Sequence, residues 1–141
     1  MTVHAFKAVL LTALLLAIGC GPAGRVRVSE KELFGTYQTD FSNAPTGQIV
    51  GKEQIILHSD NTYEQIFSSS TRKFMNRGTW KSSNMFLDGT EIELNEAIVS
   101  EDAPSGTLVR HGDLYLQVHK ENGHLKLARN EAFDWYYDRM Q

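Results

Sequence analysis

Residues 113–129 read DLYLQVHKENGHLKLAR, and this stretch decides the fold class because it predicts a β-hairpin with one apolar face. Two runs of alternating apolar and polar residues flank Asn122-Gly123, a pair typical of a two-residue hairpin turn. Pairing across this turn separates an apolar face from a polar face: Leu114, Leu116, Val118, Leu125 and Leu127 against Gln117, His119, Glu121, His124 and Lys126. Such a division indicates an antiparallel sheet that buries one side.

The rest of the chain repeats this short-strand pattern and contains no long helical period. We expect further strands at 35–40, 53–58, 62–68, 74–81, 84–87, 90–95, 107–110 and 133–140. Ser82-Ser83-Asn84 predicts a turn, and Asp88-Gly89 predicts a hairpin that pairs Leu87 with Thr90 and Met85 with Ile92. Residues 97–105 are expected to form a polar loop.

The link Ser59-Asp60-Asn61 predicts the register of the second hairpin. Asn tolerates the left-handed conformation, and three-residue hairpin loops with such a residue are common. We therefore expect Leu57 opposite Tyr63. This register gives one inward face, made of Ile55, Leu57, Tyr63 and Phe67.

Successive hairpins predict an up-and-down meander, which leaves two exposed edges unless it closes. Pairing the strand of Tyr37 with the strand of Trp135 would close it. The predicted fold is therefore all-β, a small antiparallel up-and-down barrel of about eight strands, which leaves room for side chains or one small ligand. The residues expected to line or fill it are Tyr37, Leu57, Tyr63, Phe67, Trp80, Trp135 and Tyr137. We expect a filled interior; any pocket would suit an apolar, flat or acyl-like ligand.

The N-terminus has the layout of an export signal. Lys7 precedes an uncharged stretch, residues 8–19, which is shorter than the roughly 20 residues of a membrane span. The run Leu16-Ala17-Ile18-Gly19-Cys20 resembles the lipobox of bacterial lipoproteins, and Cys20 is the only cysteine. An ordinary secretory signal is the alternative.

The lipobox resemblance implies cleavage before Cys20, with lipid on the thiol and on the new α-amine. More than one acyl chain makes a stable membrane anchor. Because Gly21 is not the aspartate linked to inner-membrane retention, the resemblance implies an outer-membrane lipoprotein facing the periplasm in a Gram-negative host.

This interpretation divides the chain into a signal peptide, 1–19, a lipidated cysteine with its tether, 20–28, and a barrel domain, 29–141. Ser29 and Glu32 match a capping box and predict one helical turn into Leu33-Phe34. Cleavage removes Lys7, which leaves 13 basic against 17 acidic residues and a formal charge of −4. A mildly acidic chain without a basic run argues against nucleic-acid binding.

No constellation for catalysis or for a cofactor stands out, so we expect a protein that is not an enzyme. His119, Glu121 and His124 share the polar face of the hairpin and could be considered as a metal site. His119 should lie opposite Lys126, however, so the imidazoles are diagonal neighbours beside a cation. Exposed hairpin histidines are the expectation, with no bound metal.

Three short motifs resemble the lipocalin-like domains of bacterial lipoproteins: Gly35-Thr36-Tyr37, the strand–Asp60-Asn61-Thr62-Tyr63–strand unit, and Gly78-Thr79-Trp80. Tyr37 stands where lipocalins carry Trp, and Arg139 could take the place of the arginine that packs on it. The resemblance implies a non-enzymatic binding module for a small hydrophobic ligand. The alternative is a solid barrel that acts as an envelope structural or protein-interaction module.

Overall fold

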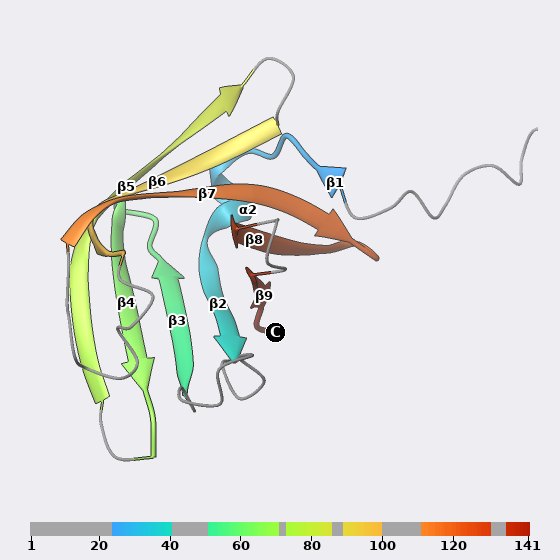
Figure 1. Cartoon of the computed structure of the whole chain (residues 1–141). Coiled ribbons are helices and arrows are strands. Elements are labelled where there is room, and N and C mark those ends of the chain that lie inside the picture. Colours follow the sequence, from blue (N-terminus) through green and yellow to red (C-terminus); the bar gives the residue numbers. More distant parts are fainter. Residues whose placement is uncertain (1–23, 41–50, 71–72, 86–88, 100–110, 131–134) are drawn as a thin grey trace, which may run out of the picture.

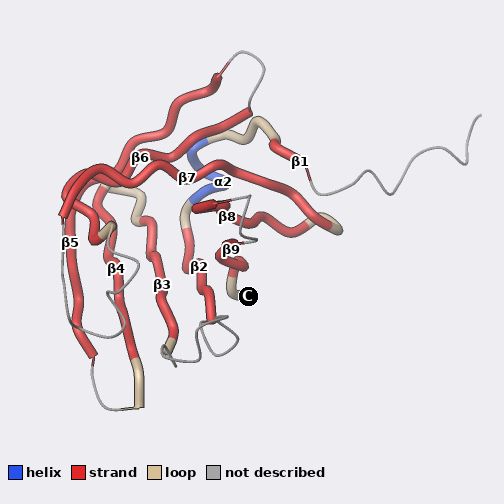
Figure 2. Tube along the Cα trace, in the orientation of Figure 1, coloured by secondary structure: helices blue, strands red, loops and turns tan. Residues whose placement is uncertain are grey.

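A computed structural model describes residues 24–40, 51–70, 73–85, 89–99, 111–130 and 135–141. Strands make up nearly all of this part, with one short helix (Figures 1 and 2). The elements are β1 (Gly24–Arg25), α2 (Glu30–Leu33), β2 (Gly35–Asp40), β3 (Lys52–Leu57), β4 (Thr62–Ser68), β5 (Lys73–Met85), β6 (Gly89–Ile98), β7 (His111–Glu121), β8 (His124–Asn130) and β9 (Trp135–Arg139).

The sheet closes into an antiparallel barrel of eight strands, β2 to β9, and β1 is an additional strand. Each barrel strand pairs with its neighbours in the sequence. The ring closes where β2 pairs with β9, with Tyr37 opposite Arg139 and Gln38 opposite Asp138. The predicted fold class and the predicted pairing of the first strand with the last are therefore confirmed.

The core fills the barrel with side chains that alternate along each strand. Those of Leu33, Tyr37, Ile55, Leu57, Tyr63, Trp80, Ile92, Leu94, Leu116, Val118, Leu127 and Tyr137 are almost wholly buried. A smaller cluster holds Phe67, Ile98 and the half-buried Phe74. The inward faces predicted for the 55–67 hairpin and for the 113–129 hairpin are both correct.

Two turns adopt the predicted conformations. Asn61 has φ 65°, and Leu57 pairs with Tyr63. Asn122 and Gly123 have φ 50° and 84°, with Glu121 paired to His124. Both registers follow because a left-handed residue fits the right-handed twist of the flanking strands.

The turn predicted at Ser82–Asn84 is wrong, because β5 runs unbroken through these residues. Met85 pairs with Gly89, and Ser82 pairs with Ile92, so the predicted Met85–Ile92 pair is also wrong. The polar residues fit a strand here because Ser83, Asn84 and Met85 are exposed where β5 extends along β6. Leu87, and the strand expected at 107–110, lie outside the described residues.

The residues assigned to the start of a polar loop, Ala97 and Ile98, instead end β6 and are buried. The register of β6 against β7 shifts between Leu94 and Ala97, and Glu96 has φ 57°. This bulge lets the strand continue inward past two polar residues, Asn95 and Glu96, which had suggested its end.

The predicted tether is in part a strap held against the barrel. We call residues 24–34 the N-terminal strap. β1 pairs with the end of β7, Val26 N donates to Val118 O at 3.0 Å, and Thr90 N donates to Val26 O at 2.8 Å. Val26 and Val28 pack against the core, and the alternation Arg25-Val26-Arg27-Val28 therefore marks an extended, half-buried segment.

The strap ends in the predicted helical turn. Ser29 donates from its backbone N and from its Oγ to Glu32 Oε2, both at 2.8 Å. Leu33 at the end of α2 is fully buried, so this turn closes one end of the barrel.

Candidate functional site

All seven predicted lining residues lie in the barrel interior. Trp135 is half-buried, and the other six, Tyr37, Leu57, Tyr63, Phe67, Trp80 and Tyr137, are at most 2% exposed. They pack against one another and against aliphatic side chains of the two core clusters. Phe67 stacks on Phe74 with ring centroids 4.7 Å apart, and Phe34 meets Trp80 edge-on at 6.0 Å.

Arg139 secures the helical end of the barrel. Its guanidinium lies 6.0 Å from the centroid of the Tyr37 ring and donates to Glu32 O at 2.9 Å and to Phe34 O at 2.6 Å. Tyr37 in turn donates to Leu33 O at 2.9 Å, and burial raises the pKa of Tyr37 to about 12. The contact between Arg139 and Tyr37 that the sequence suggested is present.

A charged layer lies inside the barrel toward the opposite end. We call Glu53, Gln65, Arg129 and Tyr137 the polar layer. Arg129 Nη1 is 3.3 Å from Glu53 Oε2, and their side chains are 6% and 0% exposed. Gln65 Nε2 donates to Glu53 Oε1 at 2.7 Å, and the Tyr137 hydroxyl donates to Glu53 Oε2 at 2.8 Å.

The polar layer suits an ionised Glu53. Burial raises the pKa of Glu53, and the charge of Arg129 with the hydrogen bonds from Gln65 and Tyr137 opposes that rise. All three neighbours donate to the carboxylate, whereas a protonated carboxyl would need an acceptor for its own proton. Burial and the adjacent Glu53 raise the pKa of Tyr137 well above its usual value, which keeps the phenol a donor.

Arg129 is held by further contacts. Its Nη2 donates to Val99 O at 2.9 Å, and its guanidinium lies 4.2 Å from the centroid of the Trp135 ring. The layer therefore links β3, β4, β8 and β9 with the end of β6. It can hold a charge pair away from water, and the described side chains satisfy one another.

Sequence reasoning missed the polar layer, although a signal for it was present. Glu53 stands in phase with the inward Ile55 and Leu57, Gln65 with Tyr63 and Phe67, and Arg129 with Leu125 and Leu127. Because strands alternate with period two, each of these polar residues had to point inward. Alternation thus indicates inward-pointing charges of opposite sign, and closure of the barrel brings Glu53 on β3 and Arg129 on β8 together.

A second feature is an incomplete junction between β5 and β6. Only the C-terminal half of β5, Trp80–Met85, pairs with β6. Within the described residues, the N-terminal half of β5, Lys73–Thr79, pairs with β4 alone. On the N-terminal side of Trp80, side chains from both β4 and β5 bond the backbone of β6 instead. Tyr63 Oη donates to Asn95 O at 2.9 Å, Asn76 Nδ2 donates to Glu96 O at 2.9 Å, and Gln65 exchanges two bonds with the backbone of Ile98.

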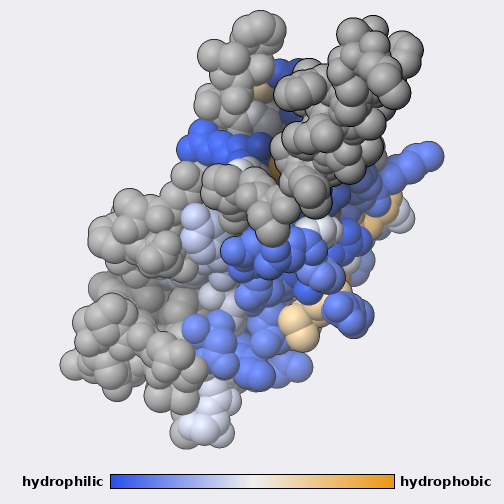
Figure 3. Space-filling view, turned by 90° about the vertical axis from the view of Figure 1, so that its right-hand side faces the viewer, coloured by the Kyte–Doolittle hydropathy of each residue, from blue (hydrophilic) through white to orange (hydrophobic). Residues whose placement is uncertain are grey.

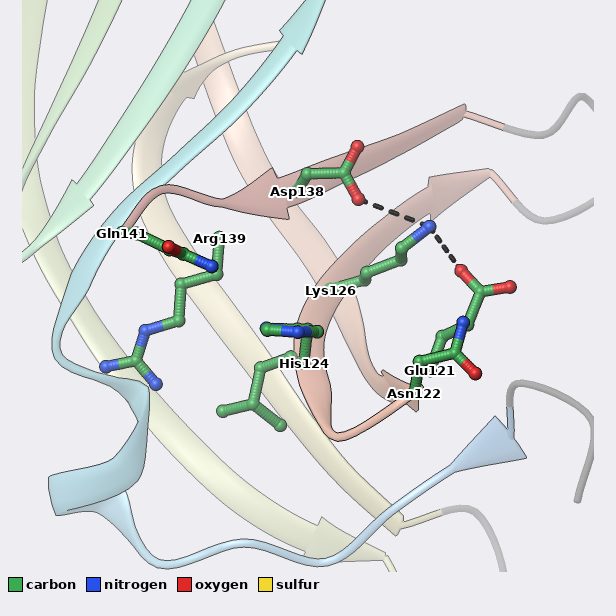
Figure 4. Close-up of a pocket in the computed structure, with 8 residues that line it drawn as sticks. Glu121, Asn122, His124, Lys126, Asp138, Arg139 and Gln141 are labelled. Carbon is green, nitrogen blue, oxygen red and sulfur yellow. Dashed lines mark ion pairs between the residues drawn. The ribbon is translucent and has the colours of Figure 1, made fainter. Parts of the chain in front are cut away.

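Two shallow hollows lie on the outer surface formed by the described residues. One, of about 300 Å³, lies between the β7–β8 turn and β9, where Lys126 bonds both Glu121 and Asp138 (Figure 4). The other, of about 530 Å³, lies along β4 and β5 and is lined by His58, Thr62, Tyr63, Glu64, Arg77, Gly78 and Thr79. The side that bears β1 and the β7–β8 hairpin is mainly hydrophilic among its described residues (Figure 3).

The hairpin histidines differ from the expectation in one respect. His119 lies opposite Lys126 as predicted, but it is 5% exposed and meets the Tyr136 ring edge-on at 5.6 Å. Its prediction as an exposed side chain is wrong, because Tyr136 on β9 covers it. His124 is exposed. Within the described ranges, no group of three or more His, Cys, Asp and Glu side chains is placed to hold a metal ion.

The fold and these sites define a small antiparallel β-barrel with a filled, partly charged interior. No family model, curated protein or solved structure matches the chain. Among the described residues, none of the helices has the length and hydrophobicity needed to cross a membrane. Cys20 and the segment before it lie outside the described residues.

Proposed function

We propose that the protein is a lipid-anchored lipoprotein of the bacterial envelope whose barrel acts through its outer surface on another envelope protein. The barrel is not an enzyme, and its contact with the membrane is made by lipid on Cys20. In a Gram-negative host the expected place is the outer membrane, facing the periplasm.

The filled interior is the observation that favours action through the outer surface. Trp80, Tyr37, Tyr63 and Tyr137 come from four different strands, and each is at most 2% exposed. Because such side chains fill the interior of this small barrel, the described residues leave little volume inside it for a ligand. The hollows along its outside are open instead.

The N-terminal strap supports an anchor close to the barrel. Only three residues separate Cys20 from Gly24, where β1 begins. An extended chain covers at most about 3.6 Å per residue, so lipid on Cys20 would hold β1 within roughly 15 Å of the bilayer surface. Partners of the barrel would then belong to the same surface.

Metabolic labelling tests the anchor. Cells that express the full chain are grown with an alkyne fatty acid, and the tagged protein is compared with Cys20→Ser. The wild type should incorporate label and sediment with membranes, whereas Cys20→Ser should do neither. Equal labelling of the two, or an unlabelled wild-type protein, would contradict lipidation at Cys20.

Photocrosslinking tests the outer surface. A photoreactive residue at exposed Tyr115 or His124 is compared with one at Met140 in living cells, for the wild type and for Cys20→Ser. A discrete adduct from at least one position, lost in Cys20→Ser, is expected. Identical patterns at all positions, or none, would contradict the proposal.

A small-ligand barrel is the second candidate, favoured by the polar layer. Binding sites in proteins are mostly apolar with a few precisely placed polar groups. Arg129 and Tyr137 beside Trp135 would give an acyl-like ligand one polar end. Native mass spectrometry of the protein purified from its own host decides this: a co-purifying small molecule supports the candidate, and a clean mass of the protein alone rejects it.

A further inference from the structure

Among the described residues, the N-terminal half of β5 has one backbone edge without a neighbouring strand. Trp80 N donates to Asn61 O on the β4 side at 2.8 Å, whereas Thr79 O faces β6, where Asn95 Nδ2 lies at 3.4 Å. Backbone groups alternate along an antiparallel strand, so those of Met75 and Arg77 face the β6 side as well. In the described part of the chain, no hydrogen bond reaches them there.

The facing side of this junction is already satisfied. Tyr63, Asn76 and Gln65 bond the backbone of Asn95, Glu96 and Ile98, as described above. β6 therefore has no need of β5 at these positions. With respect to the described residues, the edge of β5 is left with donors and acceptors for which a further strand is the natural partner.

The charge of the exposed side chains along this edge indicates which kind of strand could pair with it. The exposed side chains of this edge are Lys73, Met75, Arg77 and Thr79, which alternate with inward Phe74 and Asn76. Arg77 Nη2 lies 3.3 Å from Glu64 Oε1, and 70% of the Arg77 side chain is exposed. A second copy paired antiparallel about Met75 would set Lys73 opposite Arg77, and like charges directly opposite destabilise a sheet.

We propose that the Lys73–Thr79 edge of β5 binds an extended acidic segment of another envelope protein as an added antiparallel strand. Acidic side chains of the segment lie opposite Lys73 and Arg77, and an apolar one lies opposite Met75. The hollow beside Thr62, Arg77 and Thr79 receives a further side chain. This inference rests on the proposed function and names the surface and the class of partner.

Amide hydrogen exchange of the full chain with synthetic peptides tests the inference directly. The probes are acetylated seven-residue peptides with Glu at the second and sixth positions, Val at the fourth and Thr elsewhere, a matched set with Lys in place of Glu, and the acidic peptide N-methylated at alternate amides. The acidic peptide should protect the amides of Met75 and Arg77 at least about ten-fold. The basic and N-methylated peptides should not.

Variants at the edge provide the matched controls. Met75→Pro removes an edge N–H, which edge strands tolerate, and should abolish binding, whereas Met75→Ala keeps that N–H and should bind. Lys73→Glu should weaken the acidic peptide about five-fold and favour the basic one. Far-UV circular dichroism confirms that each variant is folded.

Binding of the N-methylated peptide equal to that of its parent would overturn the inference, as would absence of protection at Met75 and Arg77. If this happens while Cys20-dependent adducts still form from Tyr115 or His124, only the β5 edge is rejected. If no adduct forms from any position, the proposed function fails with it.

Discussion

At the scale of single residues, the most consequential contact is the buried pair of Glu53 and Arg129. Removing two charges from water is costly, and their attraction offsets this only when hydrogen bonds complete the site. Gln65, Tyr137 and the carbonyl of Val99 provide those bonds. The pair therefore joins strands that are far apart in the sequence, and each partner depends on the other.

Replacing Glu53 by Gln should be severely destabilising at neutral pH. The variant leaves the Arg129 cation buried without its counter-charge. The new side-chain amide group of Gln also faces Gln65, Arg129 and Tyr137, which are all hydrogen-bond donors. We expect a loss of about 3–5 kcal/mol in the free energy of unfolding. Urea denaturation followed by fluorescence measures this. Glu64→Gln, which breaks the exposed Arg77 pair, should cost no more than about 1 kcal/mol.

The double variant Glu53→Leu/Arg129→Met separates charge from packing. Replacing both ions by apolar side chains of similar volume is often neutral, so the double variant should recover most of the stability that Glu53→Gln loses. A double variant as unstable as Glu53→Gln would mean that the hydrogen bonds to Gln65 and Tyr137, and not the charge balance, dominate this layer.

At the scale of elements, the contact of the N-terminal strap with β6 is not predicted by the sequence pattern. Gly89 begins β6 with φ 80°, and a Cβ there would lie 2.8 Å from Val26 O. The same residue therefore serves two demands: a left-handed backbone after the β5–β6 connection, and close approach of the strap. Only glycine meets both.

Gly89→Ala and Gly123→Ala form a matched pair. Gly123 has φ 84° and nothing within 4 Å of an added Cβ, so its substitution should cost roughly 1–2 kcal/mol of backbone strain alone. Gly89→Ala should lose about 1–3 kcal/mol more, because the Cβ must displace Val26. Thermal unfolding compares them, and exchange of the Val26 amide reports whether the strap has moved; equal losses would contradict the predicted contact.

At the scale of the whole molecule, the interior joins all eight barrel strands into one packed unit. Tyrosines from β2, β4 and β9 are fully buried within it. Burial raises the pKa of Tyr37 and of Tyr63 from 10.0 to about 12. The ionised phenolates are thus disfavoured in the folded state relative to the unfolded chain.

Stability should therefore fall as the pH rises from about 10 toward 12. In this window the unfolded tyrosines lose their protons while the folded ones keep them, so the unfolded state binds fewer protons and its relative free energy drops. Urea midpoints measured from pH 9 to 11.5 should decrease steadily. Tyr37→Phe should show a shallower decrease; an unchanged slope would mean that Tyr37 ionises equally in both states.

The amino-acid sequence by itself determined the strand pattern, the Asn61 and Asn122-Gly123 turns and the inward faces of two hairpins. These are local, because alternation and turn chemistry act over a few residues. Lipidation at Cys20 likewise remains a prediction from a local motif.

Only the tertiary structure decided the unbroken β5, the seating of the strap and the polar layer. Each depends on a contact between segments that are far apart in the sequence: Ser82 with Ile92 of β6, Val26 with Gly89, and Glu53 with Arg129. Closure of the barrel brings these together, and no local pattern encodes which inward residues face one another once the ring is closed.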